Sequence, residues 1–521
     1  MRSPFPLAIA LIAALAAHGC APAEEEDVST DAAFLSDYVD DYENDAEEDA
    51  AQANLEARVE ASDELDDGAA AKRTHGAVSI LQDDAYLGSY DDASSKAHYA
   101  DARALGPDVI RLGVIWQAAA PAGTSLTRPA FDAADPAGYD WSSVDRRYDN
   151  ARAAGLRVLV TIHSPIPHWA SEEPARCKDN PHCAWKPKPR EHAAFVTALG
   201  RHLKAKGPVW AFTLWNEPNL GFFLGGEDDV ARGMRYRKFW FQGLKALRKT
   251  AGQRTARVFF GDMANGAHSP DHWAVFHYAL CLPSPNKDAR PPCAAHPRKV
   301  YTAGIAFHPY APSPRGVENA YETMLGFVDD ASRAGRLSAN RPVYLTEHAF
   351  LTRGLVEPAP SAGLGAPGNI VTPAEQATYD DQVDHAVFAH PRVRSLAQFG
   401  VMDEGDGKWD SGLRFNDIVH PTNPRKGEAK PAWYSYRLAI DVTRVDGDTV
   451  LVFGHARACR SAFVVEGRAT ATKAWSVRAT VATDDLGYAT KSLPSAGIDA
   501  WRLRCSSDAT IASRETGART P

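Results

Sequence analysis

Eight short apolar segments alternate with stretches of helical periodicity between residues 78 and 399 of this chain. Most of the segments are continuously apolar, as expected when both faces of a parallel strand are covered. In the longer stretches, apolar residues recur at the three- and four-residue spacing of an amphipathic helix. We expect strands at 78–81, 109–114, 157–163, 209–215, 257–262, 303–308, 343–346 and 395–399, and helices at 95–105, 141–154, 191–206, 232–250, 317–334 and 373–389.

Eight strands with intervening helices predict an α/β fold of the closed (β/α)8, or TIM-barrel, type. A doubly wound open sheet has the same periodicity and stays an alternative. After the first strand, the sequence Gln82-Asp83-Asp84 stands where nucleotide-binding folds carry a glycine fingerprint, which favours the barrel. We expect the barrel to occupy residues 75–441.

The sequence pattern changes after Trp433: short segments typical of β-strands follow, separated by Gly, Asp and Ser. We expect a small β-sandwich-like domain at residues 442–505, with a thin core of its own. The polar, turn-rich residues 506–521 are expected to be a disordered tail. The strands expected in the small domain are 449–453, 462–465, 474–482 and 500–503.

Charge is distributed unevenly along the chain, whose 57 basic and 66 acidic residues give a net charge of -9. Residues 24–67 contain a single basic residue, Arg58, and carry a net charge of -18, so the remainder carries +9. Like charges at this density repel rather than fold, and we expect residues 20–74 to be a disordered acidic linker. The acidic total argues against a nucleic-acid partner.

The first twenty residues have the build of a secretory signal, with Arg2 followed by a short apolar run at residues 7–17. We expect residues 1–19 to be a signal peptide. Cys20 follows small residues and resembles the lipidated cysteine of bacterial lipoproteins, although His18 departs from that pattern. Ordinary secretion without an anchor is the alternative. In either case the protein is expected to be exported, with a membrane contact only through the lipid.

Seven cysteines become an even set of six when Cys20 is set aside. In an exported protein the default for cysteines that are neighbours in sequence is a disulfide. Zinc would require repeated Cys/His pairs at finger spacing, and only Cys177, His182 and Cys183 approach that pattern, so we expect no metal. The expected disulfides are Cys177–Cys183, Cys281–Cys293 and Cys459–Cys505.

Functional side chains of a (β/α)8 barrel gather at the carboxyl ends of its strands. Glu217 follows Asn216 at the end of the fourth expected strand, and Glu347 ends the seventh. His308-Pro309-Tyr310 ends the sixth strand. Two glutamates at one rim suit the acid/base and nucleophilic chemistry that breaks a glycosidic bond.

These motifs resemble the clan A retaining glycoside hydrolases. The match comprises Asn216-Glu217-Pro218 preceded by Trp215, a second glutamate at the end of strand seven, His308-Pro309-Tyr310 and Arg111 in strand two. The run at 215–220 is most similar to glycoside hydrolase family 39, which contains β-xylosidases, α-L-iduronidases and some exopolysaccharide-cleaving endoglycosidases. Cellulase-like family 5 uses similar motifs. The resemblance spans residues 77–439.

The resemblance implies that Glu217 is the acid/base and Glu347 the nucleophile. Arg111 and the Tyr310 phenol are suited to hold Glu347 as an anion, and Asn216 to bind the sugar 2-hydroxyl. Carboxyl groups about 5–5.5 Å apart would mean retention of anomeric configuration, whereas about 6.5–9.5 Å would mean inversion. Two carboxylates supply the chemistry, so no cofactor is expected.

Other polar and aromatic residues near strand ends are candidates for substrate binding. His163 and His308 are placed to bond sugar hydroxyls, or they are satisfied structural histidines. Trp116 and Trp409 are placed to stack on sugar rings, or they are packing residues. The rival carboxylates, expected to be substrate contacts or ion pairs, are Asp83, Asp84, Asp262, Asp403 and Glu404.

The sequence therefore predicts an exported retaining glycoside hydrolase whose partner is a carbohydrate, namely a plant or microbial polysaccharide or oligosaccharide. The alternative is a non-catalytic carbohydrate-binding surface lipoprotein on the same barrel, which would require one glutamate to be unusable.

Overall fold

The computed structural model describes residues 76–89, 91–265, 273–284, 291–352, 370–404, 409–416 and 427–520. The predicted signal peptide (1–19), Cys20 and the predicted linker (20–74) lie outside the described residues. Within the described part of the chain, no helix has both the length and the apolar character that a bilayer span requires.

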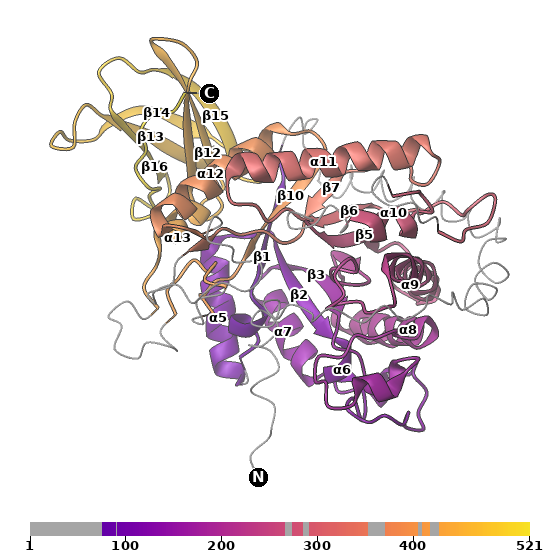
Figure 1. The fold of residues 1–521 in the computed structure, drawn as a ribbon. Coiled ribbons are helices and arrows are strands. Elements are labelled where there is room, and N and C mark those ends of the chain that lie inside the picture. The colour runs from indigo at the N-terminus through magenta and orange to yellow at the C-terminus, as the bar shows by residue number, and fades with distance from the viewer. Residues whose placement is uncertain are drawn as a thin grey trace.

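Eight parallel strands form the closed barrel that the sequence predicts (Figure 1). Neighbouring strands follow the order β1-β10-β7-β6-β5-β4-β3-β2, so the last strand of the barrel pairs with the first. The open-sheet alternative is excluded by this closure. The strands are β1 (Val78–Gln82), β2 (Val109–Ile115), β3 (Arg157–His163), β4 (Ala211–Thr213), β5 (Arg257–Ala264), β6 (Gly304–His308), β7 (Val343–Leu345) and β10 (Val393–Phe399).

Helices surround the barrel and begin and end where local chemistry favours it. Helix α12 begins with a capping box, in which Thr372 and Glu375 bond each other's backbone N–H groups. Helix α5 ends at Gly106, whose φ of 83° is a left-handed stop. The helices are α4 (Asp84–Leu87), α5 (Asp92–Leu105), α6 (Trp116–Ala119), α7 (Ser142–Ala153), α8 (Pro189–Lys206), α9 (Asp229–Lys249), α10 (Ala274–Ala279), α11 (Pro314–Arg333), α12 (Pro373–Ala389) and α13 (Pro431–Arg437).

The barrel interior is filled by side chains in two chemically different zones. Toward the amino ends of the strands, one buried residue from each of the eight strands contributes to an apolar plug. Above the plug lie buried polar residues, including Arg111, Thr213 and Asp262. The plug closes one end of the barrel and the polar zone forms the floor of the other. The plug residues are Ile80, Val109, Leu159, Ala211, Phe259, Ala306, Tyr344 and Ala397.

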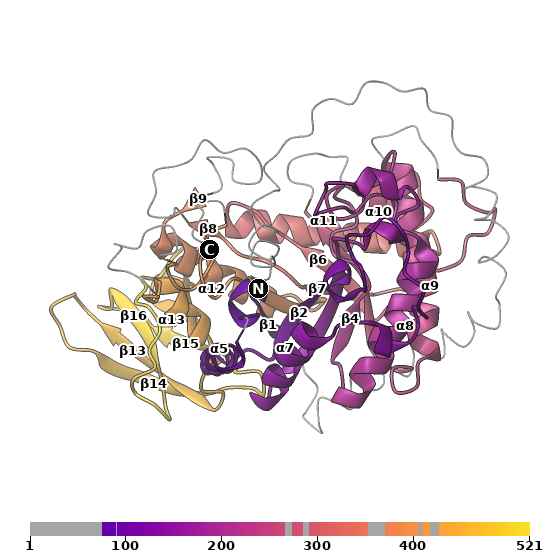
Figure 2. The ribbon, with the colours of Figure 1, turned by 90° about the horizontal axis from the view of Figure 1, so that it is seen from below.

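A small β-domain follows the barrel and lies beside α12 and α13 in both views of the molecule (Figures 1 and 2). It consists of two three-stranded sheets, ordered β11-β12-β15 and β14-β13-β16, which share one apolar core. The domain begins at Ala439, three residues before the expected boundary, and two of its strands, β11 and β15, were not expected. Its strands are β11 (Ala439–Arg444), β12 (Thr449–His455), β13 (Ala462–Arg468), β14 (Ser476–Ala482), β15 (Tyr488–Pro494) and β16 (Ala500–Cys505).

Two short elements lie in the region between β7 and α12. Strand β8 (Leu351–Thr352) pairs in parallel with β9 (Ile370–Val371).

The three disulfides predicted from the cysteine spacing are present: Cys177–Cys183, Cys281–Cys293 and Cys459–Cys505. Disulfides of this kind are typical of proteins in oxidising, extracellular compartments.

The segment after Cys505 is ordered in the structure, so the expected disordered tail is wrong for residues 506–520. Its backbone bonds the β-domain, with Thr516 and Trp501 exchanging two hydrogen bonds of 2.8 and 2.9 Å. Arg514 then forms an ion pair of 2.5 Å with Asp381 of α12, and Arg519 one of 2.7 Å with Asp441. Composition suggested disorder because the anchoring residues are polar, and their partners lie far away in sequence.

Candidate active site

The predicted site residues converge at the carboxyl ends of the barrel strands, where local backbone geometry turns them inward. Glu217, four residues beyond the end of β4, has a left-handed φ of 41°. Asp262 has a φ of 63° and lies in a bulge of β5, between Gly261 and Met263, where the register with β6 shifts. Positive φ values at residues other than glycine are uncommon and concentrate at functional sites.

Arg111 of β2 contacts four polar side chains from the barrel floor. Its Nη2 donates to Asn216 Oδ1 and Asp262 Oδ2, each at 2.7 Å. Its Nη1 donates to Gln82 of β1 and, at 3.3 Å, to Glu347 Oε2. Because the guanidinium is almost wholly buried, these contacts fix it as a permanent cation beneath Glu347.

Asp262 is the carboxylate at the centre of the buried polar zone, and the structure shows it as an ion-pair residue. Besides Arg111, its oxygens accept hydrogen bonds from Thr213, Thr346 and His308. Although burial alone would raise the pKa of Asp262, Arg111 and His308 hold it well below its usual range. Asp262 therefore supplies a fixed negative charge that orients Arg111 and His308.

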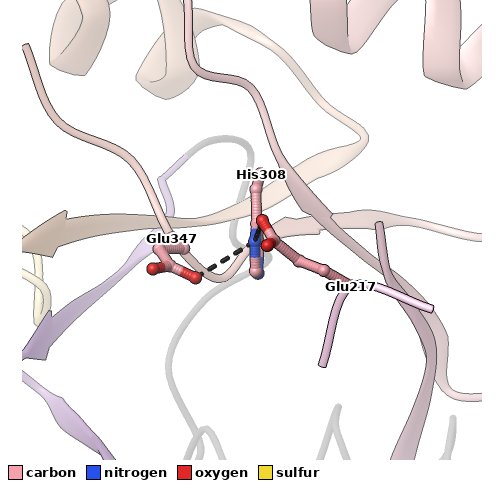
Figure 3. Close-up of side chains that lie close together, drawn as sticks. All are labelled: Glu217, His308 and Glu347. Atoms are coloured by element: carbon pink, nitrogen blue, oxygen red, sulfur yellow. Dashed lines mark hydrogen bonds and ion pairs between the residues drawn. The ribbon is translucent and has the colours of Figure 1, made fainter. Parts of the chain in front are cut away.

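The two glutamates meet at His308, which ends β6 (Figure 3). His308 Nδ1 lies 2.8 Å from Glu217 Oε1 and 3.0 Å from Glu347 Oε2. One ring nitrogen of His308 and one carboxylate oxygen of each glutamate all lie within 4.8 Å of one another. Each glutamate side chain is 12% exposed. The glutamates are thus adjacent to each other and open to a ligand.

His308 is held between carboxylates on both sides of its ring. Nε2 lies 3.1 Å from Asp262 Oδ1, so each ring nitrogen faces an acidic oxygen. Burial lowers the pKa of His308, but the charges of Glu347 and Asp262 outweigh it and raise the pKa to about 9. The ring is therefore an imidazolium at neutral pH.

Burial raises the pKa of Glu347 above its ordinary value, and the neighbouring His308 and Arg111 cations offset part of that rise. Both cations contact the same oxygen, Oε2. The second oxygen of the carboxylate is left for another partner. This is the arrangement that an anionic nucleophile requires, with charge held on one side and a reactive atom on the other.

Tyr310 and Trp409 form an aromatic pair next to the glutamates. Their ring centroids lie 5.5 Å apart with an interplanar angle of 30°. The Tyr310 hydroxyl is buried, and burial together with the charges of Glu347 and Glu217 raises its pKa well above 10. The phenol therefore stays protonated and is available as a donor beside Glu347.

His163 lies at the end of β3, close to a second group of charges. Asp84 accepts hydrogen bonds from the Gly113 N–H at 2.9 Å and from Arg147 at 2.7 Å. A side chain at Gly113 would collide with both His163 and Asp84, which explains the glycine. Burial lowers the pKa of His163 to about 4, so the ring is neutral.

Trp116 does not belong to the site, which corrects the expectation that it stacks on a sugar. Its side chain is completely buried and packs against Phe195 and Trp215, with ring centroids 5.6 and 6.4 Å away. Trp116 directly follows β2 and is the first residue of α6. Its side chain therefore faces the layer of helices and not the mouth of the barrel. Sequence position gave no indication of this direction.

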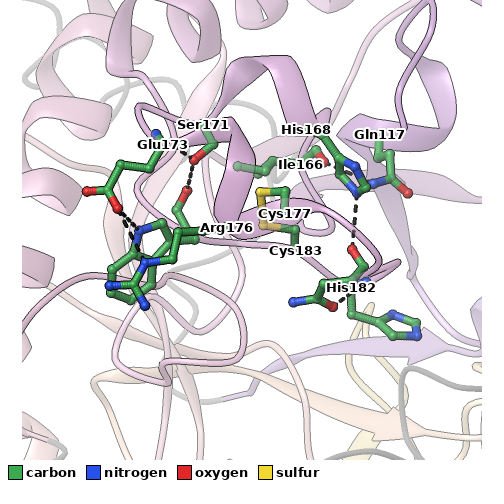
Figure 4. The surroundings of a disulfide bond; sticks show 11 residues. Gln117, Ile166, His168, Ser171, Glu173, Arg176, Cys177, His182 and Cys183 are labelled. Carbon is green, nitrogen blue, oxygen red and sulfur yellow. Dashed lines mark hydrogen bonds and ion pairs between the residues drawn. A yellow bond between two sulfur atoms is a disulfide. The ribbon is translucent and has the colours of Figure 1, made fainter. Parts of the chain in front are cut away.

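The loop between β3 and α8 is a packed structure closed by the Cys177–Cys183 disulfide (Figure 4). Both cysteines are fully buried. The Cys183 carbonyl accepts a hydrogen bond of 2.9 Å from the Ile166 N–H, and the Ile166 carbonyl accepts one from the Gln117 amide. Because the loop follows the carboxyl end of β3, it forms part of the rim of the barrel mouth.

The remaining rival carboxylates have structural partners. Asp83 accepts hydrogen bonds from the backbone of Tyr86, Val401 and Met402. Asp403 pairs with the buried Lys430 at 2.5 Å. Glu404 is partly buried. The expectation of ion pairs is therefore confirmed for Asp84, Asp262 and Asp403.

Sequence reasoning missed the network that supports the glutamates. Gln82, Thr213 and Thr346 contact Arg111 or Asp262 but belong to no motif. The available signal was polarity inside otherwise apolar strands, because an interior polar residue requires a partner.

Among the described residues, Glu217, His308 and Glu347 are also the one group whose donor atoms converge closely enough to hold a metal ion.

Comparisons with known proteins give structural likenesses alone. The sequence matches no protein-family profile and no curated protein. A family 30 subfamily 8 xylanase from Clostridium acetobutylicum is 13% identical, with a TM-score of 0.39 over 81% of this chain and 93% of that one. A glucosidase from Croceicoccus marinus is 12% identical, with a TM-score of 0.44 over 76% of each chain.

A β-glucosidase from Pyrococcus furiosus is 14% identical, with a TM-score of 0.41 over 70% of this chain and 94% of that one. Likenesses at these values carry no functional conclusion. The function is therefore inferred from the side chains of the site.

Proposed function

We propose that the protein is a retaining glycoside hydrolase in which Glu217 is the acid/base and Glu347 the nucleophile. The observation that carries this proposal is the pair of glutamates on His308, with carboxylate oxygens within 4.8 Å of each other. Retaining enzymes place their two carboxyl groups about 5–5.5 Å apart, whereas inverting enzymes leave about 6.5–9.5 Å for a water molecule. The observed separation supports retention.

In the first step, the Glu347 carboxylate attacks the anomeric carbon while the bond to the leaving oxygen breaks. Glu217 donates its proton to that oxygen, which leaves as a hydroxyl group. The product is a glycosyl ester of Glu347. As the nucleophile loses its negative charge, the Arg111 and His308 cations are balanced by Asp262 and by Glu217, which has become a carboxylate.

In the second step, the Glu217 carboxylate takes a proton from water, and the water oxygen attacks the anomeric carbon. The ester bond to Glu347 breaks, which restores the carboxylate and releases a sugar with its original configuration. Asn216 is suited to bond the sugar 2-hydroxyl, because Arg111 fixes its amide oxygen and leaves the amide nitrogen free to donate. Tyr310 and Trp409 supply the aromatic surface beside the sugar.

Azide rescue separates the roles of the two glutamates. Glu347→Ala should be inactive on aryl glycosides, and added azide should give a glycosyl azide of inverted configuration, because azide occupies the place of the nucleophile. Glu217→Ala should give an azide product of retained configuration, because azide replaces water after the ester forms. The matched control is Asp403→Asn, a rival carboxylate outside the site. Full activity of both alanine variants would contradict the proposal.

The non-catalytic alternative is tested by the same panel. A carbohydrate-binding protein would bind oligosaccharides but release no aryl leaving group, with or without azide. The adjacent, ligand-accessible glutamates favour catalysis. Family 39 membership stays a proposal that rests on the motif at residues 215–220.

We also propose export, with Cys20 lipidated and residues 20–74 as the spacer that separates the barrel from a membrane. The three disulfides support an oxidising compartment. A polysaccharide or oligosaccharide is the proposed substrate. Mass spectrometry of the mature N-terminus, compared between wild type and Cys20→Ser, tests the lipid. An unmodified wild-type terminus would exclude it.

A further inference from the structure

A small cavity lies at the junction of the barrel, α12, α13 and the β-domain. Its volume is about 20 Å³, enough for one water molecule. Asp380, Asp381 and Asp384 of α12 line it, together with His348, Ser435 and Arg457. Acidic side chains therefore outnumber basic ones in an internal space.

The three carboxylates differ in their partners. Asp384 pairs with Arg457 at 2.9 Å and with His455 at 2.9 Å. Asp381 pairs through Oδ2 with Arg514 at 2.5 Å. Asp380 has no hydrogen-bond or ion-pair partner among the described residues. Two guanidinium groups thus face three carboxylates.

Buried polar atoms in the cavity lack partners, both on His348, which is not part of the acidic cluster, and on Asp381. His348 is 2% exposed, and neither of its ring nitrogens has a hydrogen-bond partner in the described part of the protein. Asp381 Oδ1 is buried and also unpartnered there. Unpaired buried polar atoms are costly, so they indicate a ligand that is small and able to bond both donors and acceptors.

A metal ion does not fit this requirement. No three donor atoms around the cavity converge closely enough to ligate one, judged over the described residues. A proton, with or without one water molecule, does fit. It neutralises the excess carboxylate and gives the unpartnered acceptors a donor.

We propose that the cavity is a proton-binding site formed by Asp380 and Asp381, and that the proton bound there stabilises the contact between the barrel and the β-domain. The bound proton lies on one of these two carboxyl groups, which then donates to an acceptor in the cavity or to its water. This inference is independent of the proposed glycosidase activity.

The charged and titratable groups around the site agree with this assignment. Burial raises the pKa of Asp380 well above its ordinary value and that of Asp381 to about 7. Burial lowers the pKa of His455 and of His348, so both rings are neutral and add no compensating charge. The other facing groups are His385 on α12, Lys430 and Tyr436 at α13, Asp441 on β11, Tyr488 on β15, and Arg514 and Arg519 in the C-terminal segment.

The sign of the pH dependence follows from the raised values. The folded state holds a proton that the unfolded chain releases near pH 4, so stability is complete below about pH 4. It is lost as pH rises through about 7, the pKa of Asp381. Between about pH 4 and 7, each unit by which the pH rises should therefore lower the folding equilibrium constant about tenfold for each proton that the folded state holds.

Thermal and denaturant unfolding of the full chain at about pH 5 and about pH 8 tests the proposal. Wild type should lose stability between these values, and the isosteric Asp380→Asn/Asp381→Asn variant should lose much less. Asp384→Asn is the matched control, because Asp384 is ionised and paired with Arg457, and it should be destabilised at both pH values. An unchanged pH slope in the double variant would overturn the proposal.

Infrared spectroscopy provides a readout that does not depend on unfolding. A protonated buried carboxyl group gives a carbonyl stretch distinct from that of a carboxylate. At about pH 6 wild type should show this band, and Asp380→Asn/Asp381→Asn should lose part of it, the rest belonging to other buried carboxyl groups. Absence of the band in wild type would overturn the proposal even if the variants do not fold.

Discussion

Arg111 does more than the sequence predicts for it. The sequence suggests only that Arg111 holds Glu347 as an anion, and the structure shows it also bonded to Gln82, Asn216 and Asp262. Periodicity places Arg111 inside a strand but gives no information about which neighbours its five donors reach, because those neighbours come from other strands. One guanidinium therefore sets the positions of both the amide and the carboxylate of the site.

Replacing Arg111 by Met should lower the free energy of unfolding by about 3–5 kcal/mol, because Asp262 would become a buried charge without its main partner. Denaturant unfolding measures this change. Arg111→Lys should recover part of the stability but not the contact with Asn216, because a single ammonium does not span both positions. A methionine variant as stable as wild type would show that Asp262 is neutral.

His308 should make stability depend on pH in the alkaline range. Its pKa is about 9 in the folded protein and about 6.5 in an unfolded chain, so the stabilisation is complete below about pH 6.5 and lost as pH rises through 9. The difference corresponds to about 3 kcal/mol. Unfolding measured from about pH 6 to 10 should show this slope in wild type and not in His308→Asn.

The two tryptophans show why single residues are poorly predicted. Trp116 and Trp409 both follow barrel strands, yet one packs against Phe195 in the helix layer and the other lies against Tyr310 in the site. The difference is the direction of the side chain, which depends on the turn that follows each strand. Glu217 and Glu347 do lie together at the rim where their motifs place them, because each motif specifies the strand end.

The barrel strands were predicted almost completely, whereas the β-domain strands were predicted in part. Barrel strands are covered on both faces and form continuous apolar runs. In strand β15 three consecutive residues, Thr490, Lys491 and Ser492, are exposed, so burial does not alternate along it and the sequence lacks a recognisable strand pattern. Strand β11 follows α13 almost directly and was merged with the end of the barrel.

The three disulfides should contribute to stability in the order of the loops they close. Their sequence separations are 6, 12 and 46 residues for Cys177–Cys183, Cys281–Cys293 and Cys459–Cys505. Loop-closure entropy predicts about 2, 3 and 4 kcal/mol, respectively. Paired Cys→Ser variants, compared by denaturant unfolding under non-reducing conditions, test the order. A larger loss for the shortest loop would show that native packing, not chain entropy, dominates.

Removing the C-terminal segment should loosen the attachment of the β-domain to the barrel. A chain that ends at Cys505 loses the ion pairs of Arg514 with Asp381 and of Arg519 with Asp441. We expect a loss on the order of 3 kcal/mol in the free energy of unfolding, because both partners are buried acids. A chain lacking only Thr520 and Pro521 is the control and should match wild type.

Contacts between the two domains were beyond sequence reasoning. Asp381 and Arg514 are 133 positions apart and carry no motif, and the composition of the tail suggested disorder. Such pairs form because α12 presents acids toward the β-domain, a face that is determined only when the whole chain has folded. The domain order, by contrast, follows directly from where the βα alternation stops.

The apolar plug at the base of the barrel gives the proposed active site a single entrance. Ile80, Val109, Phe259 and their neighbours close the opposite end. A departing sugar fragment and the incoming water must therefore use the same opening in turn. If the proposed glycosyl ester forms, a second sugar at that opening would compete with water for it. At high sugar concentration the proposed activity should then build glycosidic bonds as well as break them.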